Sequence, residues 1–212
     1  MDLEDMRRHY AARSLDVGDL DPSPFRQFDR WMREAIETKV LEPNAMSLAT
    51  STPDGQPGLR TVLLKGFDER GLVFYTNYDS AKAAQLAANP LVALLFLWLP
   101  LERQVVITGR AEKVSAAESF RYFVSRPRDS RIGAWASRQS EVITTRSLLE
   151  TKFAEMKAKF AEGEIPLPGF WGGFRVQPAT FEFWQGRPNR MHDRLRYACQ
   201  GDGRWLISRL MP

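Results

Sequence analysis

Residues 45–65 read AMSLATSTPDGQPGLRTVLLK, and this stretch is the most informative about the class of fold. Met46, Leu48 and Thr50 alternate with Ser and Ala, a period of two that is typical of a strand with one buried face. Asp54-Gly55 favours a tight turn, and an apolar strand pattern resumes from Arg60 to Leu64. The stretch therefore predicts a β-hairpin.

Strand patterns also fill much of the chain beyond this hairpin. Alternation and turn residues predict strands over 72–76, 91–98, 104–114, 173–176, 181–184, 195–198 and 205–210. The spacing of apolar residues predicts helices over 25–39, about 80–89, 116–124 and about 140–162. Regular helices do not separate the strands, and the sequence has no GxGxxG or Walker motif, so a Rossmann sheet is disfavoured. We predict an α+β fold, mainly antiparallel, with a small barrel and peripheral helices.

The size and composition of the chain indicate one domain spanning residues 1–212. Of the 212 residues, 43% are hydrophobic, which is enough for one core, and no low-complexity linker interrupts them. The longest apolar run, 91–101, is too short to cross a bilayer. The N-terminus is charged where a signal peptide is apolar, and Cys199, the single cysteine, cannot form an internal disulfide. We therefore expect a cytoplasmic protein without membrane association.

The charge balance suggests an anionic ligand. Thirty Lys and Arg against 26 Asp and Glu give a net charge of +4, which suits nucleic acid, a membrane surface or small phosphorylated molecules. The basic residues stand singly or in pairs, without a run of five or six. This dispersion favours small anions over nucleic acid.

Two histidines are present, and one of them lies among arginines. On a strand, Arg190, His192 and Arg194 would share one face, where three cationic groups repel one another unless an anion binds. A solvated strand edge is the alternative explanation. His9 lies in a charged N-terminal segment, for which a solvated terminus is the simpler interpretation.

A second basic group consists of Arg126 and Ser130, shortly after Tyr122 and before the polar stretch 137–140. Arginine, serine and backbone N–H groups near a helix start can together bind a phosphate. The alternative is an ordinary polar connection between helices.

A third basic group, formed by Arg60, Lys65 and Lys82, could hold a second phosphate, although lone basic residues at strand ends are usually just solvated. The sequence lacks a nucleophile elbow, a His-Glu-x-x-His motif and paired cysteines, so hydrolase and metal-site interpretations have no support. With several anion sites and few candidate bases, a redox cofactor is the natural alternative.

Several long strings, in one order, resemble the pyridoxine/pyridoxamine 5'-phosphate oxidase family. They are RTVLLK (60–65), FYTN (74–77), LERQ (101–104), SRPRDS (125–130), IGAW (132–135), PGFWGGF (168–174), FEFWQ (181–185) and RMHDR (190–194). The resemblance runs from about Arg7 to Pro212. It implies a split β-barrel homodimer that binds one FMN per subunit in clefts at the interface.

The resemblance also implies roles for individual residues. The expected FMN contacts, some of them from the partner chain, are Arg60, Thr61, Val62, Leu63, Leu64, Lys65, Tyr75, Thr76, Lys82, Gln104, Gln139, Ser140, Trp184 and Arg194. The expected substrate contacts are Arg7, Arg8, Tyr10, Lys65, Tyr122, Arg126, Ser130, Arg190 and His192. Of these, Arg190 and His192 are expected to be catalytic. Residues 1–20 are expected to form a mobile lid.

The implied reaction oxidises pyridoxine 5'-phosphate or pyridoxamine 5'-phosphate to pyridoxal 5'-phosphate, with hydride transfer to the flavin. O2 then accepts the electrons and yields H2O2, and the amine substrate also releases ammonia. Arg190 would bind the reacting end of the substrate, and His192 would assist binding or proton transfer.

One position departs from the family pattern, because Ser80-Ala-Lys82 stands where Ser-Arg-Lys is usual. The flavin phosphate would therefore lose one charged partner at Ala81. Two alternatives stay open at this point: a split-barrel flavin reductase or non-catalytic FMN-binding protein, and, from another class, a nucleic-acid-binding barrel.

Overall fold

The structure is a computed structural model that describes residues 13–212. Its helices and strands follow one another as η1 (Val17–Asp19), α1 (Pro24–Glu37), β1 (Ala45–Ser51), β2 (Pro57–Leu63), β3 (Gly66–Asp68), β4 (Gly71–Asn77), α2 (Ala81–Ala88), β5 (Leu91–Trp98), η2 (Leu99–Leu101), β6 (Arg103–Lys113), α3 (Ala116–Ser125), α4 (Arg128–Ala136), α5 (Arg146–Lys159), β7 (Trp171–Gln185), η3 (Pro188–Arg190), β8 (Asp193–Cys199) and β9 (Trp205–Leu210).

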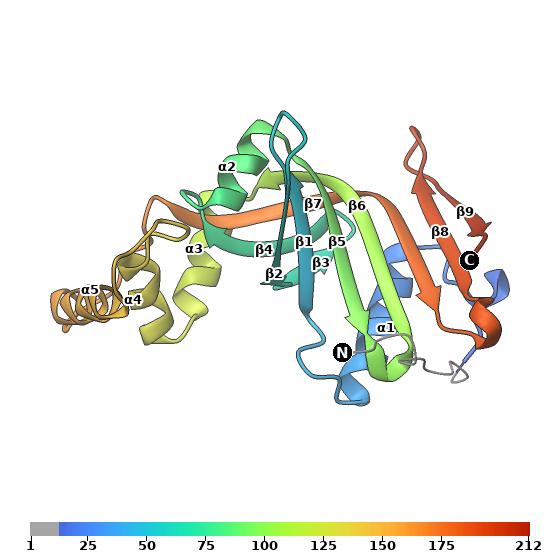
Figure 1. Cartoon of the computed structure of the whole chain (residues 1–212), viewed down its shortest axis with the longest axis horizontal. Helices are drawn as coiled ribbons and strands as arrows, with labels where there is room; N and C mark the ends of the chain where they lie inside the picture. The colour runs from blue at the N-terminus through green and yellow to red at the C-terminus, as the bar shows by residue number, and fades with distance from the viewer. Residues whose placement is uncertain (1–12) are drawn as a thin grey trace.

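The nine strands form one antiparallel sheet that curls into a half-barrel (Figure 1). Its order is β2-β1-β5-β6-β7-β4-β3, and β8 and β9 extend it from β7. Strand β7 is 15 residues long and pairs with β4 near its start and with β8 near its end. This confirms the α+β, mainly antiparallel split-barrel prediction.

The core lies between the curled sheet and α1, which packs against it (Figure 1). Phe28 and Trp31 of α1 are fully buried, and their rings meet Phe96 and Phe183 of the sheet at centroid distances of 5.0 and 5.1 Å. The apolar residues whose three- and four-residue spacing predicted this helix thus form the face that it buries.

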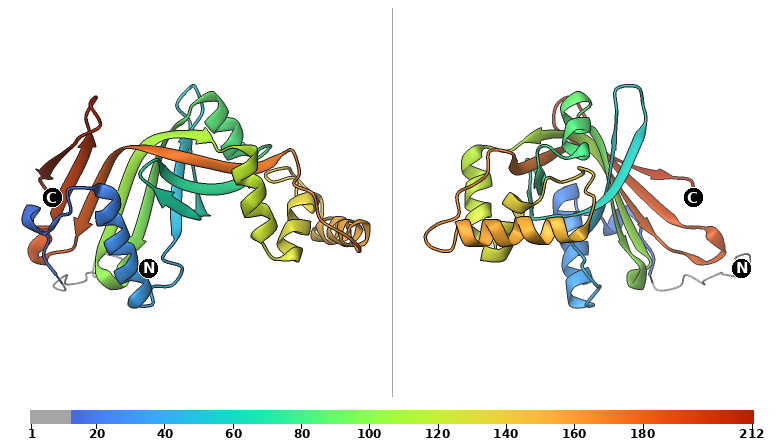
Figure 2. Two further views of the ribbon diagram at one scale, coloured as in Figure 1. Left: turned by 180° about the vertical axis from the view of Figure 1, so that it is seen from behind. Right: turned by 60° about the vertical axis from the view of Figure 1, so that its left-hand side comes forward.

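A second, smaller core joins α3, α4 and α5 to the start of β7. Its buried members are Phe123, Ile132, Phe160, Ile165 and Trp171. Figure 2 shows these helices set to one side of the half-barrel, away from α1. They therefore wall a space beside the sheet rather than cover it.

The structure differs from the predicted helices and strands in three places. The strands expected at 173–176 and 181–184 are one strand, because a register shift between Thr108 and Gly109 accommodates Pro178. Gly109 is required there, since a Cβ would lie 2.1 Å from the carbonyl oxygen of Gln177. Helix α5 begins at Arg146 rather than near 140, and α4 was not predicted as a helix.

The expected strand through 190–194 was also wrong in its first half. Residues 188–190 form a 3-10 turn that starts at Pro188, and Asn189 and Arg190 both have positive φ, 57° and 60°. Strand β8 begins only at Asp193. Arg190, His192 and Arg194 therefore do not share a strand face, although all three lie in the same part of the chain.

Of the expected lid, residues 1–20, the structure describes residues 13–20. Arg7, Arg8, His9 and Tyr10 lie outside the described residues. Residues 13–20 pack on the C-terminal strands: Leu15 is 4% exposed, its N–H donates to Asp193, and Arg209 donates to its carbonyl.

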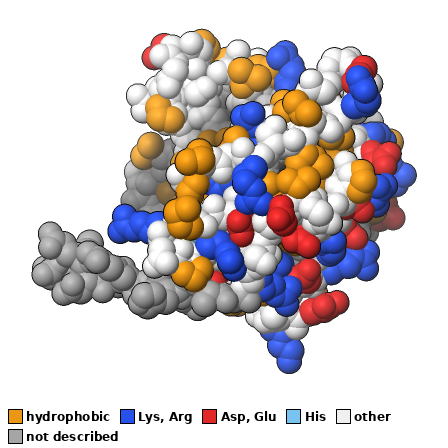
Figure 3. All heavy atoms as spheres, turned by 90° about the vertical axis from the view of Figure 1, so that its right-hand side faces the viewer, with side chains coloured by type: hydrophobic (Ala, Val, Ile, Leu, Met, Phe, Trp, Pro, Cys, Tyr) orange, Lys and Arg blue, Asp and Glu red, His pale blue; other side chains and the backbone are white. Residues whose placement is uncertain are grey.

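The surface at this end of the molecule mixes basic, acidic and apolar side chains without one dominant charge (Figure 3). Within residues 13–212, no helix is long and apolar enough to span a membrane. The same residues contain no group of three His, Cys, Asp or Glu side chains that could hold a metal ion.

Candidate functional site

A cavity of about 920 Å³ lies between the sheet and the α2, α3 and α4 helices. Thirteen of the residues expected to bind ligands line it: Arg60, Thr61, Val62, Leu63, Lys65, Tyr75, Thr76, Lys82, Tyr122, Arg126, Ser130, Gln139 and Ser140. The fold thus brings together both basic groups that the sequence suggested as phosphate sites.

Lys82 is the most buried cation of this cavity. Its Nζ donates to Thr76 Oγ1 at 3.1 Å, Ser80 Oγ at 3.3 Å and Gln139 Oε1 at 2.7 Å, all uncharged groups. Burial, and secondarily Arg60, lower the pKa of Lys82 to about 8. Within residues 13–212 this buried ammonium has no charged partner, so a bound anion would stabilise its charged form.

Arg60 lies on the same side of the cavity and is held by neutral oxygens. Its Nη1 donates to Leu48 O at 3.2 Å and to Thr50 Oγ1, and its Nη2 donates to Gln85 Oε1 at 3.3 Å. Burial lowers the pKa of Arg60 as well. Two cations without acidic partners therefore face the start of α2.

The first turn of α2 completes this end of the cavity. Ala81 is exposed at the cavity wall, and its N–H donates to Ser140 Oγ at 3.2 Å. Helix N-termini favour anions, so the turn adds to the two cations. The missing arginine at position 81 leaves open space where the family pattern places a charge.

We expect Ala81→Arg to tighten FMN binding by roughly tenfold, because a guanidinium facing a phosphate adds a charge-assisted hydrogen bond. Fluorescence titration of the apoprotein at two salt concentrations would measure it, with Ala81→Gln as the uncharged control. A steeper salt dependence should accompany the gain. Equal affinity in the arginine variant would mean that Lys82 and Arg60 already satisfy the phosphate.

The other end of the cavity carries Arg126, whose buried Nη1 has no hydrogen-bond partner among residues 13–212. Its guanidinium lies 4.7 Å from the centre of the Trp171 ring, and burial lowers the pKa of Arg126. Ser130 and Tyr122 line the cavity beside it. An unsatisfied, desolvated guanidinium here is suited to a second anion.

Trp171 was missed by the sequence analysis. It is 8% exposed and stacks at 5.5 Å on Tyr75, which in turn stacks at 4.0 Å on Tyr122. The signal was Gly172-Gly173: a Cβ on Gly173 would lie 2.8 Å from the Tyr75 ring. Gly173 thus leaves room for the Tyr75 ring in the aromatic stack beneath the arginine, whereas a Cβ on Gly172 would meet Tyr78.

Leu64 does not line the cavity. It is 6% exposed and belongs to the main core, and its N–H and carbonyl are bonded to Asn44. Its neighbours Leu63 and Lys65 do line the cavity, so the expected run of flavin contacts from 60 to 65 is interrupted at Leu64.

The remaining expected site residues lie elsewhere on the sheet. The register pairs Gln104 with Trp184 and Trp184 with Arg194, which sets the three side chains in a row across β6, β7 and β8. Arg194 forms an ion pair with Glu182, Nε to Oε1 2.8 Å, that raises the pKa of Arg194. The ring of His192 packs on Trp184 at 4.7 Å.

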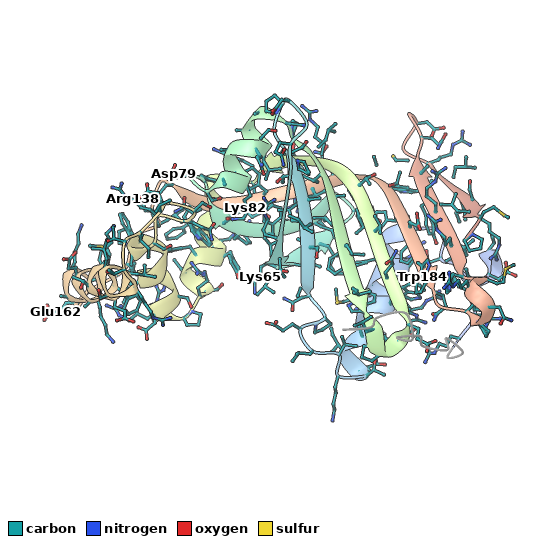
Figure 4. All side chains as sticks on the ribbon, viewed as in Figure 1. Lys65, Asp79, Lys82, Arg138, Glu162 and Trp184 are labelled. Atoms are coloured by element: carbon teal, nitrogen blue, oxygen red, sulfur yellow. The ribbon has the colours of Figure 1, made fainter. Side chains whose placement is uncertain are left out.

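This row is separated from the cavity within one chain. Figure 4 shows Lys65 and Lys82 beside β2 and α2, and Trp184 at the far end of the sheet near β8. Trp171 of the cavity and Trp184 of the row stand at opposite ends of β7. At about 3.3 Å per residue, those ends are roughly 40 Å apart along the strand, farther than one small ligand reaches.

The chain matches two family descriptions, "Pyridoxamine 5'-phosphate oxidase" over residues 32–160 and "Pyridoxine 5'-phosphate oxidase C-terminal dimerisation region" over residues 171–212. It is 60% identical to the pyridoxine/pyridoxamine 5'-phosphate oxidase of Rippkaea orientalis and 57% identical to that of Aliarcobacter butzleri, in each case over all of both chains.

Among solved structures, the chain resembles PhzG from Burkholderia lata 383, solved with tetrahydrophenazine-1-carboxylic acid. The TM-score is 0.87 at 30% identity, over 94% of this chain and 100% of that one. Full-length similarity, both matched regions and the curled sheet agree with one another. The chain therefore belongs to the pyridoxamine 5'-phosphate oxidase family.

Proposed function

We propose that this protein is an FMN-dependent oxidase that converts pyridoxine 5'-phosphate or pyridoxamine 5'-phosphate into pyridoxal 5'-phosphate. Two cations of one cavity carry the proposal: among residues 13–212, Lys82 bonds only to uncharged groups, and Nη1 of Arg126 has no hydrogen-bond partner. FMN and the substrate each bring one phosphate. Two anion sites in a single cavity fit that pair of ligands better than a flavin alone.

The residues present fit FMN. Lys82, Arg60 and the first turn of α2 would hold its phosphate, since all three offer positive charge that no carboxylate of the cavity lining neutralises. Thr61, Val62 and Leu63 of β2 would line the ring system. When bound, FMN supplies the acceptor for two electrons, and O2 restores it with release of H2O2.

The substrate phosphate would bind at Arg126, with Ser130, Tyr122 and Lys65 as further donors. This fixed anchor sets where the pyridine ring lies, and such positioning is worth several kcal/mol in oriented reactions. The aromatic stack of Tyr75, Tyr122 and Trp171 gives the anchor a rigid base.

The proposed active site is shared by two chains. The dimerisation region supports a homodimer, and the row of Gln104, Trp184 and Arg194 lies on a sheet face where Leu97, its neighbour in the register, is 51% exposed. Pairing of two such faces would bring the row of one subunit, with Arg190 and His192, onto the cavity of the other. Arg190 would then hold the reacting end of the substrate.

The test of function is turnover. Purified protein loaded with FMN should form an aldehyde from pyridoxine 5'-phosphate and consume one O2 per product. A flavin reductase or a non-catalytic flavin binder would carry the yellow cofactor and give no aldehyde. Protein that binds no flavin would overturn the cofactor assignment as well.

The shared site predicts complementation between two impaired variants, assayed with pyridoxine 5'-phosphate well below the wild-type KM. Arg126→Ala and Arg190→Ala damage opposite halves, so a mixed dimer keeps one intact site of two. Random reassociation after equal mixing makes half of the dimers mixed, and activity should recover to about a quarter of the wild-type value. A site contained within one chain would give no recovery, which co-expression with two affinity tags would reveal directly.

A further inference from the structure

The imidazole of His192 is held at one nitrogen by the backbone. The main-chain N–H of Arg187 donates to His192 Nδ1 at 3.1 Å. A neutral imidazole has one donor nitrogen and one acceptor nitrogen, so an accepting Nδ1 places the proton on Nε2. The ring therefore carries an N–H at the nitrogen that is not bonded to Arg187.

The arrangement is fixed from several sides. The Arg187 side chain donates from Nη1 to Arg13 O at 3.2 Å, and its Nε lies 3.4 Å from Asp193 Oδ2. Asp193 also accepts from the Leu15 N–H at 3.0 Å and from Arg209 Nη1 at 2.9 Å. One carboxylate thus ties the segment before α1, the 186–192 loop and β9 together.

Three arginines and one carboxylate lie close to His192 along the chain. Arg187, Arg190 and Arg194 come from the same loop and strand, and Asp193 is already paired with two arginines. On the other side, the ring packs against the uncharged indole of Trp184. A proton added at Nδ1 would also break the bond from Arg187.

We propose that His192 acts as a hydrogen-bond donor through Nε2–H, and that Arg187 and Asp193 are positioning residues that fix it in this form. His192 then binds an oxygen or nitrogen of the substrate and takes up no proton during the reaction. Of the two roles expected for His192, binding or proton transfer, the proposal keeps binding. The role in turnover rests on the proposed function, whereas the tautomer does not.

The tautomer can be measured without activity. Nitrogen-15 NMR of the histidine-labelled holoprotein at pH 9, where imidazole is neutral, should show His192 as a single Nε2–H form. The chain has only two histidines, so the signal lost in His192→Gln assigns it. A predominant Nδ1–H form would overturn the proposal, even if the protein oxidises pyridoxine 5'-phosphate.

Kinetics test the donor role. His192→Ala should lower kcat/KM roughly tenfold, the cost of one neutral hydrogen bond, and His192→Gln should recover most of the loss because its amide also donates. If Gln is as inactive as Ala, His192 does not act as a donor. If the wild type itself shows no turnover, the proposed function fails and the NMR result stands alone.

Asp193→Asn tests positioning. It should give a mixture of both tautomers and a kcat/KM near that of His192→Ala, with FMN still bound. Asp202→Asn is the matched control, because Asp202 forms the same kind of ion pair with Arg204 in the exposed β8–β9 turn. A single tautomer retained in Asp193→Asn would show that this carboxylate does not position the ring.

Discussion

Arg126→Ala should raise KM for pyridoxine 5'-phosphate by about a hundredfold while FMN stays bound. A charge-assisted hydrogen bond from the Arg126 guanidinium to a phosphate is typically worth about 1.5–3 kcal/mol, and a hundredfold change corresponds to about 2.8 kcal/mol. Nη1 of Arg126 has no hydrogen-bond partner in the described part of the chain, and the substrate phosphate would supply one. Steady-state kinetics with flavin fluorescence on the same samples would separate the two ligands.

The control for Arg126→Ala is Arg121→Ala. Arg121 is exposed on α3, the helix that ends just before Arg126, and it does not line the cavity, so it carries the same charge change without the contact. Arg126→Lys should fall between the wild type and Arg126→Ala, because an ammonium keeps the charge and loses the forked geometry. A normal KM in Arg126→Ala would place the substrate phosphate elsewhere.

Lys82→Met should weaken FMN binding by about a hundredfold, and the wild type should show a pH dependence that the variant lacks. Burial lowers the pKa of Lys82 to about 8 in the free protein, and a bound phosphate would raise it. Binding above pH 8 must therefore take up a proton. The affinity for FMN should change little between pH 7 and 7.5 and should fall by up to tenfold per pH unit above pH 8.

Titration of apoprotein with FMN from pH 7 to 9 would test this. Lys157→Met, an exposed lysine of α5, is the matched control for the lost charge. If wild-type affinity stays constant up to pH 9, the ammonium of Lys82 is not the group that binds the phosphate.

The strands were predictable from local patterns, whereas their ends were not. The local pattern located β1, β5 and β6 within a residue or two because burial alternates along them. Strand β4 is buried at six of its seven positions, and the turn residues before it located it. The register shift lies in β7 itself, where Ala179 has no partner on β6, and the strand therefore continues past Pro178, which lacks an N–H. A bulge of this kind depends on how two distant strands pair, which the local residue pattern does not indicate.

The candidate site was predictable where charge marked it. The sequence indicated Arg126 through its position with Ser130 near a helix start, and Arg60 and Lys82 as a basic group that could hold a phosphate. The fold places all three in one cavity. Trp171 escaped because an aromatic beside glycines also fits an ordinary core. The shape of the loop before β8 escaped as well, because two consecutive positive-φ residues at Asn189 and Arg190 have no signal in residue types alone.

The placement of the cavity and of the Trp184 row at opposite ends of β7 has a consequence for assembly. With a shared site, a newly made chain carries one half of each of two active sites and no complete site. It therefore gains activity only when it pairs with a second copy. On dilution below the dimer dissociation constant, the rate should fall with the square of protein concentration rather than in proportion to it. The amount of oxidase activity would then respond more steeply to the level of synthesis than the amount of protein does.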